Sequence, residues 1–262
     1  MASLRVRPEG TAGRVHHITP KSANWSYVGF DLYRLTPGEP LSNQTFDREV
    51  CLVLVSGKAE IWAGEMSFGV LGERMSPFDG PPAAVYVPAD SHWRIEAETE
   101  VELAVCSAPG LSGVYAPRRI AVHDQIERGS GTNLRRVTNI LPETDPAHAL
   151  LVVEVITPPG HSSSYPPHKH DTDNLPHESL LEETYYHRLS PSQGFAFQRV
   201  YTDDRSLDEA ILIEDGDVTL VPKGYHPCGT MHGYGLYYLN VMAGPHRVWK
   251  FHNDPDHEWM MG

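Results

Sequence analysis

The chain has 262 residues, enough for one large domain or two of ordinary size, and 40% of them are hydrophobic, which argues against global disorder. Its formal net charge is −13, and a protein with this negative field is not expected to bind a nucleic-acid backbone. There are 22 glycines and 22 prolines, which long helices tolerate poorly, so we expect many short strands joined by turns.

The first residues, Met1–Gly13, lack the apolar core of a secretory signal. No run in the chain reaches the roughly 18 apolar residues that a transmembrane helix needs. The three cysteines form no CxxC pair, so a disulfide framework is not expected. These features favour a cytoplasmic protein. Cys228 lies two residues after His226, but we interpret it as a small, partly buried residue and not as a ligand or nucleophile.

Strand-like segments with alternating or continuous apolar residues follow one another along the chain. In the first half they are Trp25–Leu35, Glu49–Ser56, Ala59–Ala63, Ala84–Val87, Trp93–Ala97 and Glu100–Ser107. In the second half they are Leu150–Thr157, Glu183–Leu189, Gly194–Tyr201, Ala210–Ile213, Asp217–Val221 and Leu236–Met242. Only Ser206–Glu209 indicates a helical turn, and Ser107–Gln125 is rich enough in Pro and Gly to be a linker.

The two halves share one order of signals, which predicts an internal repeat. Each has a strand, a glycine turn, a second strand, and then a Val-Pro pair followed by a histidine, which is His92 in the first half and His226 in the second. We therefore expect two lobes of the same β type, residues 1–120 and residues 121–262.

The strongest chemical signal is GHSSSYPPHKHD, at the residues numbered 160–171. His168 and His170 are two apart, so on a strand both imidazoles project from the same face. A divalent metal needs further donors, which Glu183, at the start of the next strand, and His226, after a Pro-Lys-Gly turn, can supply.

These paired motifs resemble those of the cupin superfamily, which implies an all-β bicupin fold of two tandem jelly-roll β-barrels. One departure is the long gap between His170 and Glu183. It contains rival ligands, and we prefer Glu183 because it opens an alternating strand. The rivals are Asp171, Asp173, His177, Glu178 and Glu182.

The first lobe has Glu49 and His92 but no His-x-His pair. His16 and His17 are adjacent and would face opposite ways on a strand. We expect this lobe to be structural and free of metal.

A second, closer resemblance covers more than half of the chain. The segments RGSGTNLRRVTNILPE (128–143), PPHKHD (166–171), LEETYYHRL (181–189), GFAFQRVYTDD (194–204), DGDVTLVPKGYHPC (215–228), YYLNVMAGP (237–245) and NDPDHEW (253–259) are together similar to the 5-deoxy-glucuronate isomerase family of myo-inositol catabolism. The related 5-keto-4-deoxyuronate isomerases share the metal pattern with a shorter His-to-Glu gap.

The resemblance implies an aldose–ketose isomerase that converts 5-deoxy-glucuronate to 2-deoxy-5-keto-gluconate with one divalent metal, which is zinc, manganese, iron or nickel. A general base must move the proton between two carbons. The candidates for this catalytic role are Tyr185, His187, Tyr238 and Glu182.

The substrate carboxylate requires a cation. Arg199 alternates with Phe195 and Phe197, which suggests either a pocket or an ion pair on that face, and Lys223 and the group of Arg128, Arg135 and Arg136 are the other candidates. The acidic NDPDHEW stretch near the end is interpreted as a capped turn and not as a second metal site.

Two alternatives remain at this point: a cupin dioxygenase, and a non-catalytic cupin that binds a sugar acid. No DNA-binding module is evident. Cupins often pair through their sheets, so a homo-oligomer is a further expectation of the resemblance.

Overall fold

The computed structural model describes residues 3–261, and strands account for nearly all of its regular structure. The chain divides into two compact units that each combine segments far apart in sequence. The first unit contains the segment up to Arg7, residues 125–137 and the chain from Glu154 onward, and the second contains residues 8–124 and 138–153. No helix in the described residues is long and apolar enough to cross a membrane.

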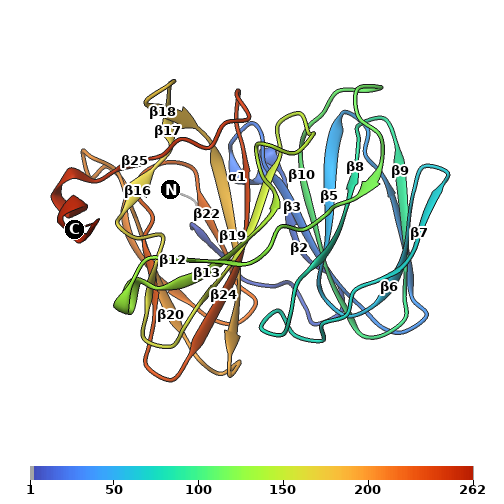
Figure 1. Ribbon diagram of the computed structural model, residues 1–262, viewed down its shortest axis with the longest axis horizontal. Helices are drawn as coiled ribbons and strands as arrows, with labels where there is room; N and C mark the ends of the chain where they lie inside the picture. Colours follow the sequence, from blue (N-terminus) through green and yellow to red (C-terminus); the bar gives the residue numbers. More distant parts are fainter. Residues whose placement is uncertain (1–2, 262) are drawn as a thin grey trace. The chain divides into compact units, whose positions relative to one another are not determined.

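The second unit is coloured blue to green in Figure 1. Its elements are β2 (Gly13–Ile18), α1 (Pro20–Ala23), β3 (Gly29–Leu35), β4 (Pro40–Gln44), β5 (Arg48–Ser56), β6 (Ala59–Ala63), β7 (Met66–Leu71), β8 (Ala83–Val87), β9 (His92–Ala97), β10 (Val101–Pro109) and β11 (Arg118–Arg119). Across its described residues the strands form two sheets, β11-β8-β5-β10-β3-β2 and β4-β9-β6-β7.

Apolar side chains fill the space between the two sheets of the second unit. Val50, Leu52 and Leu54 alternate along β5, while Trp93 and Ile95 project from β9 into the same cluster. All five side chains are at most 4% exposed. Burial of a side chain of this size stabilises the fold by roughly 1.5–3 kcal/mol, so the alternation of these strands is what joins the two sheets.

The other elements supply the sheets of the first unit, with β13 and β14 running from one unit into the other. They are β1 (Arg5–Val6), β12 (Ile126–Arg128), η1 (Gly131–Asn133), β13 (Arg135–Leu141), β14 (Leu151–Thr157), β15 (Ser162–Ser163), β16 (His168–Lys169), β17 (Asp171–Asn174), β18 (Glu178–Leu180), β19 (Glu182–Ser190), β20 (Ala196–Tyr201), β21 (Asp208–Ile213), β22 (Val218–Val221), β23 (Cys228–Thr230), β24 (Gly235–Ala243), β25 (His252–Asn253) and η2 (Pro255–Met261). The described strands form a large sheet, β1-β22-β19-β24-β14-β13-β12, a smaller one, β15-β23-β20-β21, and the pairs β16-β25 and β17-β18.

The same strand order occurs twice. The series β8-β5-β10-β3-β2 corresponds to β22-β19-β24-β14-β13, and β4-β9-β6-β7 corresponds to β15-β23-β20-β21. The order of signals that predicted an internal repeat therefore has a counterpart in the topology. No sheet closes into a barrel within residues 3–261, so the predicted jelly-roll barrels are not confirmed.

Each of the twelve predicted strands overlaps a strand of the structure, and Ala59–Ala63 coincides with β6. The prediction of a helical turn at Ser206–Glu209 is wrong. The Asp204 carboxylate accepts hydrogen bonds from the main-chain N–H and hydroxyl of Ser206, which closes a turn instead, and β21 begins at Asp208.

Candidate metal centre

Three buried side chains of the first unit converge on one point. Glu183 Oε2 lies 3.1 Å from His170 Nε2 and 3.2 Å from His226 Nε2. The three residues are at most 2% exposed, and their potential ligand atoms all lie within 4.8 Å of one another. We refer to His170, Glu183 and His226 as the His–Glu–His group.

The main chain fixes which ring nitrogen of each histidine faces this point. Nδ1 of His170 lies 3.0 Å from the carbonyl oxygen of Leu181, and Nδ1 of His226 lies 2.8 Å from that of Gly224. A carbonyl only accepts, so Nδ1 carries a hydrogen in both rings. The Nε2 atom of His226 then keeps its lone pair, whereas the Nε2 atom of His170 is hydrogen-bonded to the Glu183 carboxylate at 3.1 Å. His226 Nε2 has no hydrogen-bond partner. Two imidazole nitrogens and a carboxylate around one point are the types of donor that a divalent cation requires, and a cation would replace the hydrogen at His170 Nε2, so these residues fit a metal.

The charge states of the two histidines differ. Burial lowers the pKa of His226 to about 3, so its ring is neutral at neutral pH. Burial also lowers the pKa of His170, but its hydrogen bond to Glu183 and the charge of that carboxylate outweigh the effect and raise it. The Glu183 carboxylate therefore attracts a positive charge into this point, and Asn240 Nδ2 orients it by donating to Oε1 at 2.5 Å.

His168, the fourth predicted ligand, lies beside the His–Glu–His group but is not part of it. Its ring centroid is 5.0 Å from that of His226 and 6.5 Å from that of His170. Its Nδ1 faces the carbonyl oxygen of Pro166 at 3.2 Å, as in the other two histidines. Burial lowers its pKa to about 3, so this ring is also neutral.

A charged network joins the chain segments that carry the histidines. Lys169 points away from His168 and His170, and its Nζ lies 2.8 Å from Asp171 Oδ1 and 3.2 Å from both carboxylate oxygens of Glu178. Asp171 Oδ2 accepts the main-chain N–H of Gly224 at 2.8 Å, in the turn before His226. Gly224 has a φ of +89°, and a Cβ there would lie 2.5 Å from the Tyr201 carbonyl oxygen, so this turn needs glycine.

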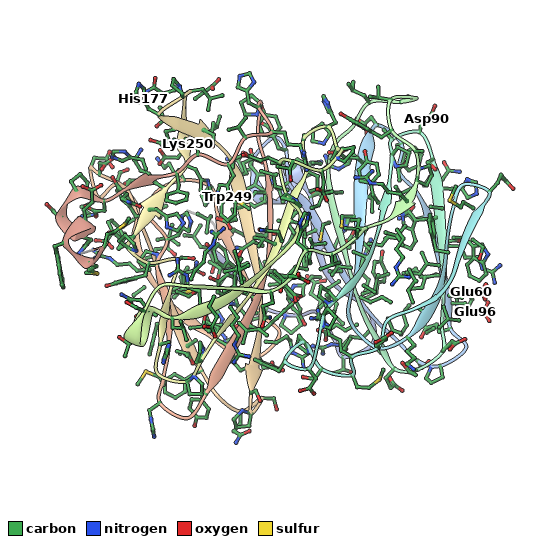
Figure 2. All side chains as sticks on the ribbon, viewed as in Figure 1. Glu60, Asp90, Glu96, His177, Trp249 and Lys250 are labelled. Atoms are coloured by element: carbon green, nitrogen blue, oxygen red, sulfur yellow. The ribbon has the colours of Figure 1, made fainter. Side chains whose placement is uncertain are left out.

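The alternative ligands between His170 and Glu183 bind other groups, are exposed, or face away from the His–Glu–His group. Asp171 and Glu178 bind Lys169, and Glu178 also accepts the main-chain N–H groups of Asp171 and Thr172. Asp173 and His177 are exposed, and Figure 2 shows His177 at the outer end of the hairpin formed by β17 and β18. Strand alternation directs Glu182 to the face of β19 opposite Glu183.

Two tyrosines and two serines lie next to the His–Glu–His group. The Tyr185 ring is 5.8 Å from the His226 ring and 5.0 Å from the Tyr238 ring. The Tyr185 hydroxyl lies 3.0 Å from Ser164 Oγ, and the Tyr238 hydroxyl lies 2.5 Å from Ser163 Oγ. Burial raises the pKa of both phenols, so both hold their protons at neutral pH. Neither serine was predicted as a site residue, although both lie in the same motif as the histidines.

His187 is completely buried behind these tyrosines. Its Nε2 lies 3.1 Å from Thr219 Oγ1, and its Nδ1 has no hydrogen-bond partner. Burial lowers its pKa to about 3, so it is a neutral imidazole. Its ring is 6.2 Å from that of Tyr238 and 5.9 Å from that of Tyr185, which makes it a neighbour of the tyrosine pair.

The predicted carboxylate-binding residues lie in different surroundings. Arg199 is exposed and forms a two-point ion pair with Asp208 at 2.7 and 2.8 Å, so it lies on the outer face of β20 and not in a pocket. Lys223 is exposed, and its charge acts on the pKa of the exposed Asp204. Arg135 is half-buried, and its charge acts on the pKa of His168 and of Tyr238.

The acidic stretch near the end of the chain is a turn, as predicted. Asp254 Oδ1 accepts the main-chain N–H of Asp256 at the start of η2, and its Oδ2 accepts the Tyr201 hydroxyl at 2.7 Å. The three cysteines are free and buried. Within residues 3–261, the His–Glu–His group is the one cluster of at least three His, Cys, Asp or Glu side chains close enough to hold a metal.

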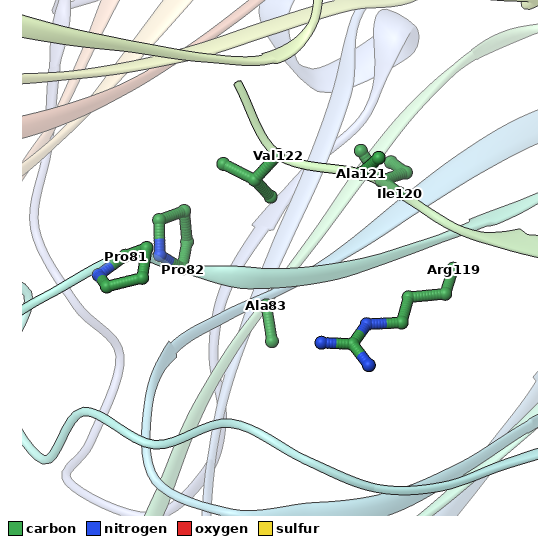
Figure 3. Close-up of a pocket in the computed structure, with 7 residues that line it drawn as sticks. All are labelled: Pro81, Pro82, Ala83, Arg119, Ile120, Ala121 and Val122. Carbon is green, nitrogen blue, oxygen red and sulfur yellow. The ribbon is translucent and has the colours of Figure 1, made fainter. Parts of the chain in front are cut away.

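The second unit has a hollow of about 440 Å³, shown in Figure 3, that is lined by Pro81, Pro82, Ala83, Arg119, Ile120, Ala121 and Val122. Its lining contains one ionisable side chain, that of Arg119. This hollow therefore lacks the donor set of a metal site and the acid–base pair of a catalytic site.

Fold and site together define the class: a mostly β protein of the cupin type with a buried His–Glu–His group suited to a metal. An oxalate decarboxylase mutant from Bacillus subtilis superposes with a TM-score of 0.66 at 12% identity, over 97% of this chain and 80% of that chain, which shows the shared fold alone.

The chain belongs to the KduI/IolB family, whose model matches residues 4–260. The 5-deoxy-glucuronate isomerase of Geobacillus kaustophilus is 58% identical over 95% of this chain and 91% of that protein. The crystal structure of an IolB-like protein from Salmonella typhimurium superposes over 100% of both chains, with a TM-score of 0.97 and 49% identity.

Proposed function

We propose that this protein is a 5-deoxy-glucuronate isomerase, which converts 5-deoxy-glucuronate to 2-deoxy-5-keto-gluconate. The observation that carries the proposal is the 58% identity to the Geobacillus kaustophilus enzyme of that name over 95% of the chain. The buried His–Glu–His group supports it, because an aldose–ketose isomerisation needs a charge that stabilises an enediolate.

The metal centre consists of His168, His170, Glu183 and His226 in this proposal. When a divalent cation is bound, it supplies a Lewis acid for the carbonyl and hydroxyl oxygens of the sugar. The three imidazoles would bind it through Nε2, and Asn240 holds the carboxylate of Glu183 in place. The metal is zinc, manganese, iron or nickel, because this mixed nitrogen and oxygen donor set suits each of them.

The protein must also move a proton from the carbon next to the aldehyde to the aldehyde carbon. Tyr185 and Tyr238 hold protons at their hydroxyl oxygens, each paired with a serine hydroxyl, so both are placed to donate hydrogen bonds to sugar oxygens. We retain His187 and Glu182 as further candidates for the proton carrier. His187 lies next to the tyrosine pair, whereas Glu182 is disfavoured by its position on the opposite face of β19.

We further infer two lobes of the bicupin type, with the metal and the active site in the C-terminal lobe (121–262) and a structural N-terminal lobe (1–120). The doubled strand order supports this division. The three buried thiols support a reducing compartment such as the cytoplasm.

The function is tested by incubating metal-loaded protein with 5-deoxy-glucuronate in deuterated water and following the product by proton NMR. We expect 2-deoxy-5-keto-gluconate with solvent deuterium at its C6, the former aldehyde carbon, because the carried proton exchanges with solvent unless it is fully shielded. Absence of the ketose in a sample that contains bound metal would overturn the isomerase proposal. Oxygen uptake with the same substrate would instead indicate a dioxygenase.

A separate measurement tests the ligands. We expect His170→Ala, His226→Ala and Glu183→Gln each to lower bound metal to below about one tenth of the wild-type content at limiting free metal, as loss of one donor from a small set does. His177→Ala is the matched control, since this histidine of the same gap is exposed. Full metal content in any of the three variants would remove that residue from the centre.

A further inference from the structure

Two arginines of the first unit lie opposite each other without an acidic partner. Arg128 in β12 and Arg135 in β13 are paired across the antiparallel ladder. Both are half-buried, and neither forms an ion pair with an acidic side chain in the part of the chain that the structure describes. Arg135 Nη1 donates to the carbonyl oxygen of Asn133 at 3.1 Å.

This pairing opposes the stability of the fold. Like charges directly opposite each other in a sheet repel, and partial burial removes water that would otherwise solvate them. The pKa of Arg128 is lowered, first by burial and then by the charge of Arg135. An unneutralised pair of cations on an otherwise acidic protein, with a net charge of −13, is what a site for an anionic ligand requires.

Gly129, in the turn between β12 and β13, leaves space for the Arg135 guanidinium because it has no side chain. Gly129 has a φ of +79°, and a Cβ there would lie 2.3 Å from the carbonyl oxygen of Asn133 and 2.9 Å from Arg135 Nη1. Any other residue would displace the guanidinium or its main-chain support. The turn Arg128-Gly129 therefore holds Arg135 in one place.

The arginine pair is also close to the metal centre. His161 Nδ1 lies 2.9 Å from the carbonyl oxygen of Leu134, which directly precedes Arg135. The helix η1, which joins the two arginine strands, contacts β15, and Ser163 of β15 is hydrogen-bonded to Tyr238. The hairpin that carries the arginines therefore neighbours the strand that contacts Tyr238.

We propose that Arg128 and Arg135 form a clamp for the carboxylate of the sugar acid. The inference rests on the proposed function, since it names the part of that site that binds the acid group. Guanidinium groups bind carboxylates through two parallel hydrogen bonds, and two of them neutralise the charge more fully than the exposed Lys223 does alone. Arg199 already binds Asp208.

The clamp is tested by calorimetric titration of metal-loaded protein with D-glucuronate and with D-glucose, which lacks the carboxylate. The variants are Arg128→Met and Arg135→Met, because methionine keeps the apolar stem and removes the charge. Arg136→Met is the matched control, since Arg136 is the exposed neighbour on the same strand. We expect glucuronate affinity to fall about 10- to 100-fold in the first two variants and to stay unchanged in the third. Glucose binding stays unchanged in all three.

Thermal unfolding of the same proteins separates this role from a structural one. Loss of an unpaired cation should leave the midpoint of unfolding unchanged or raise it, whereas loss of a structural ion pair would lower it. Undiminished glucuronate affinity in both clamp variants, or an equal loss in Arg136→Met, would overturn the clamp.

Turnover of 5-deoxy-glucuronate distinguishes the two proposals. If the wild type isomerises the sugar and the clamp variants keep its KM, the clamp is wrong and the function stands. If the wild type binds glucuronate through the arginines but converts no 5-deoxy-glucuronate, the clamp stands and the proposed function is wrong. A raised KM with a nearly unchanged kcat in the clamp variants supports both.

Discussion

In His168, His170 and His226, Nδ1 is hydrogen-bonded to a main-chain carbonyl oxygen. Since each carbonyl belongs to a turn or strand end within the fold, the backbone fixes the ring orientation, and in His170 and His226 this directs Nε2 toward Glu183. Glu183 has no such support from the main chain. Its orientation depends on side chains: Asn240 donates to Oε1, and His170 Nε2 lies 3.1 Å from Oε2.

This dependence makes Asn240 the most sensitive neighbour of the centre. We expect Asn240→Ala to weaken metal binding about tenfold or more while leaving the chain folded, because a loss in the outer shell of a metal site typically costs 10- to 100-fold in affinity. A competition titration with a metal-binding dye measures this. Asn174→Ala, in the exposed β17–β18 hairpin, is the control. Equal affinities of both variants and wild type would show that Glu183 needs no orienting partner.

The cysteines allow a prediction for pH. Burial raises the pKa of Cys228 to about 12 and raises the pKa of Cys51 and Cys106. At pH 8 a thiol with an ordinary pKa is partly thiolate, whereas these three remain protonated and inaccessible. We expect no thiol to react rapidly with a disulfide reagent in native protein and three to react after unfolding. Rapid labelling of the native form at pH 8 would contradict the buried arrangement.

Local sequence patterns predicted the strands that have a buried face but not the exposed or very short strands. Alternation and apolar runs located β5, β6 and β19 because those strands have one or two buried faces. The exposed strand β4 and the two-residue strands near the histidines have no such pattern, since their pairing depends on chain segments far away in sequence. The two halves of the arginine clamp are likewise adjacent only because β12 pairs with β13.

The gap between His170 and Glu183 shows the same limit for the site. Its acidic residues resemble ligands in sequence, yet Glu178 binds Lys169 and two main-chain amides. Nothing local in the sequence distinguishes a carboxylate that binds an ammonium from one that binds a metal. The spacing did favour Glu183, because β19 continues beyond it with alternating Tyr185 and His187.

The contacts of Glu178 with Lys169 and with two main-chain amides should contribute to stability. We expect Glu178→Ala to destabilise metal-free protein by about 3 kcal/mol, because it leaves Lys169 with one close carboxylate and two amides without acceptors. Urea denaturation measures the loss. Asp173→Ala, an exposed acid of the same hairpin, should change the free energy of unfolding by less than about 0.5 kcal/mol. Similar effects of both substitutions would mean that the network contributes nothing.

For the whole molecule, the doubled strand order relates the His–Glu–His group in one unit to apolar side chains in the other. Val50 in β5 is opposite Val87, and Glu183 in β19 is opposite Val221. Val87 and Val221 are each followed directly by a proline. The alternating positions then continue as Leu52 and Leu54 in one unit and as Tyr185 and His187 in the other. At the positions equivalent to Glu183, Tyr185 and His187, the second unit therefore has the apolar side chains of its core.

This equivalence predicts the stoichiometry of the metal. We expect one divalent ion per chain by elemental analysis of dialysed protein, and none in the double variant His170→Ala/His226→Ala. Residues 3–261 contain no second cluster of donors close enough to retain one. Two ions per chain in the wild type, or one in the double variant, would place a metal outside the His–Glu–His group.

The second unit combines residues 8–124 with the distant segment 138–153, and one buried carboxylate binds the two together. Glu49 is completely buried and accepts main-chain N–H groups of His148, Ala149 and Leu150 at 2.7–2.8 Å, together with the Tyr86 hydroxyl at 2.6 Å. Glu49→Ala leaves the three amides without an acceptor, so we expect a loss of about 3 kcal/mol or more in the free energy of unfolding, measured in urea. Tyr86→Phe removes one donor and should cost about 1 kcal/mol. If Glu49→Ala costs no more than Tyr86→Phe, the segment 138–153 is held by its apolar contacts and not by this carboxylate.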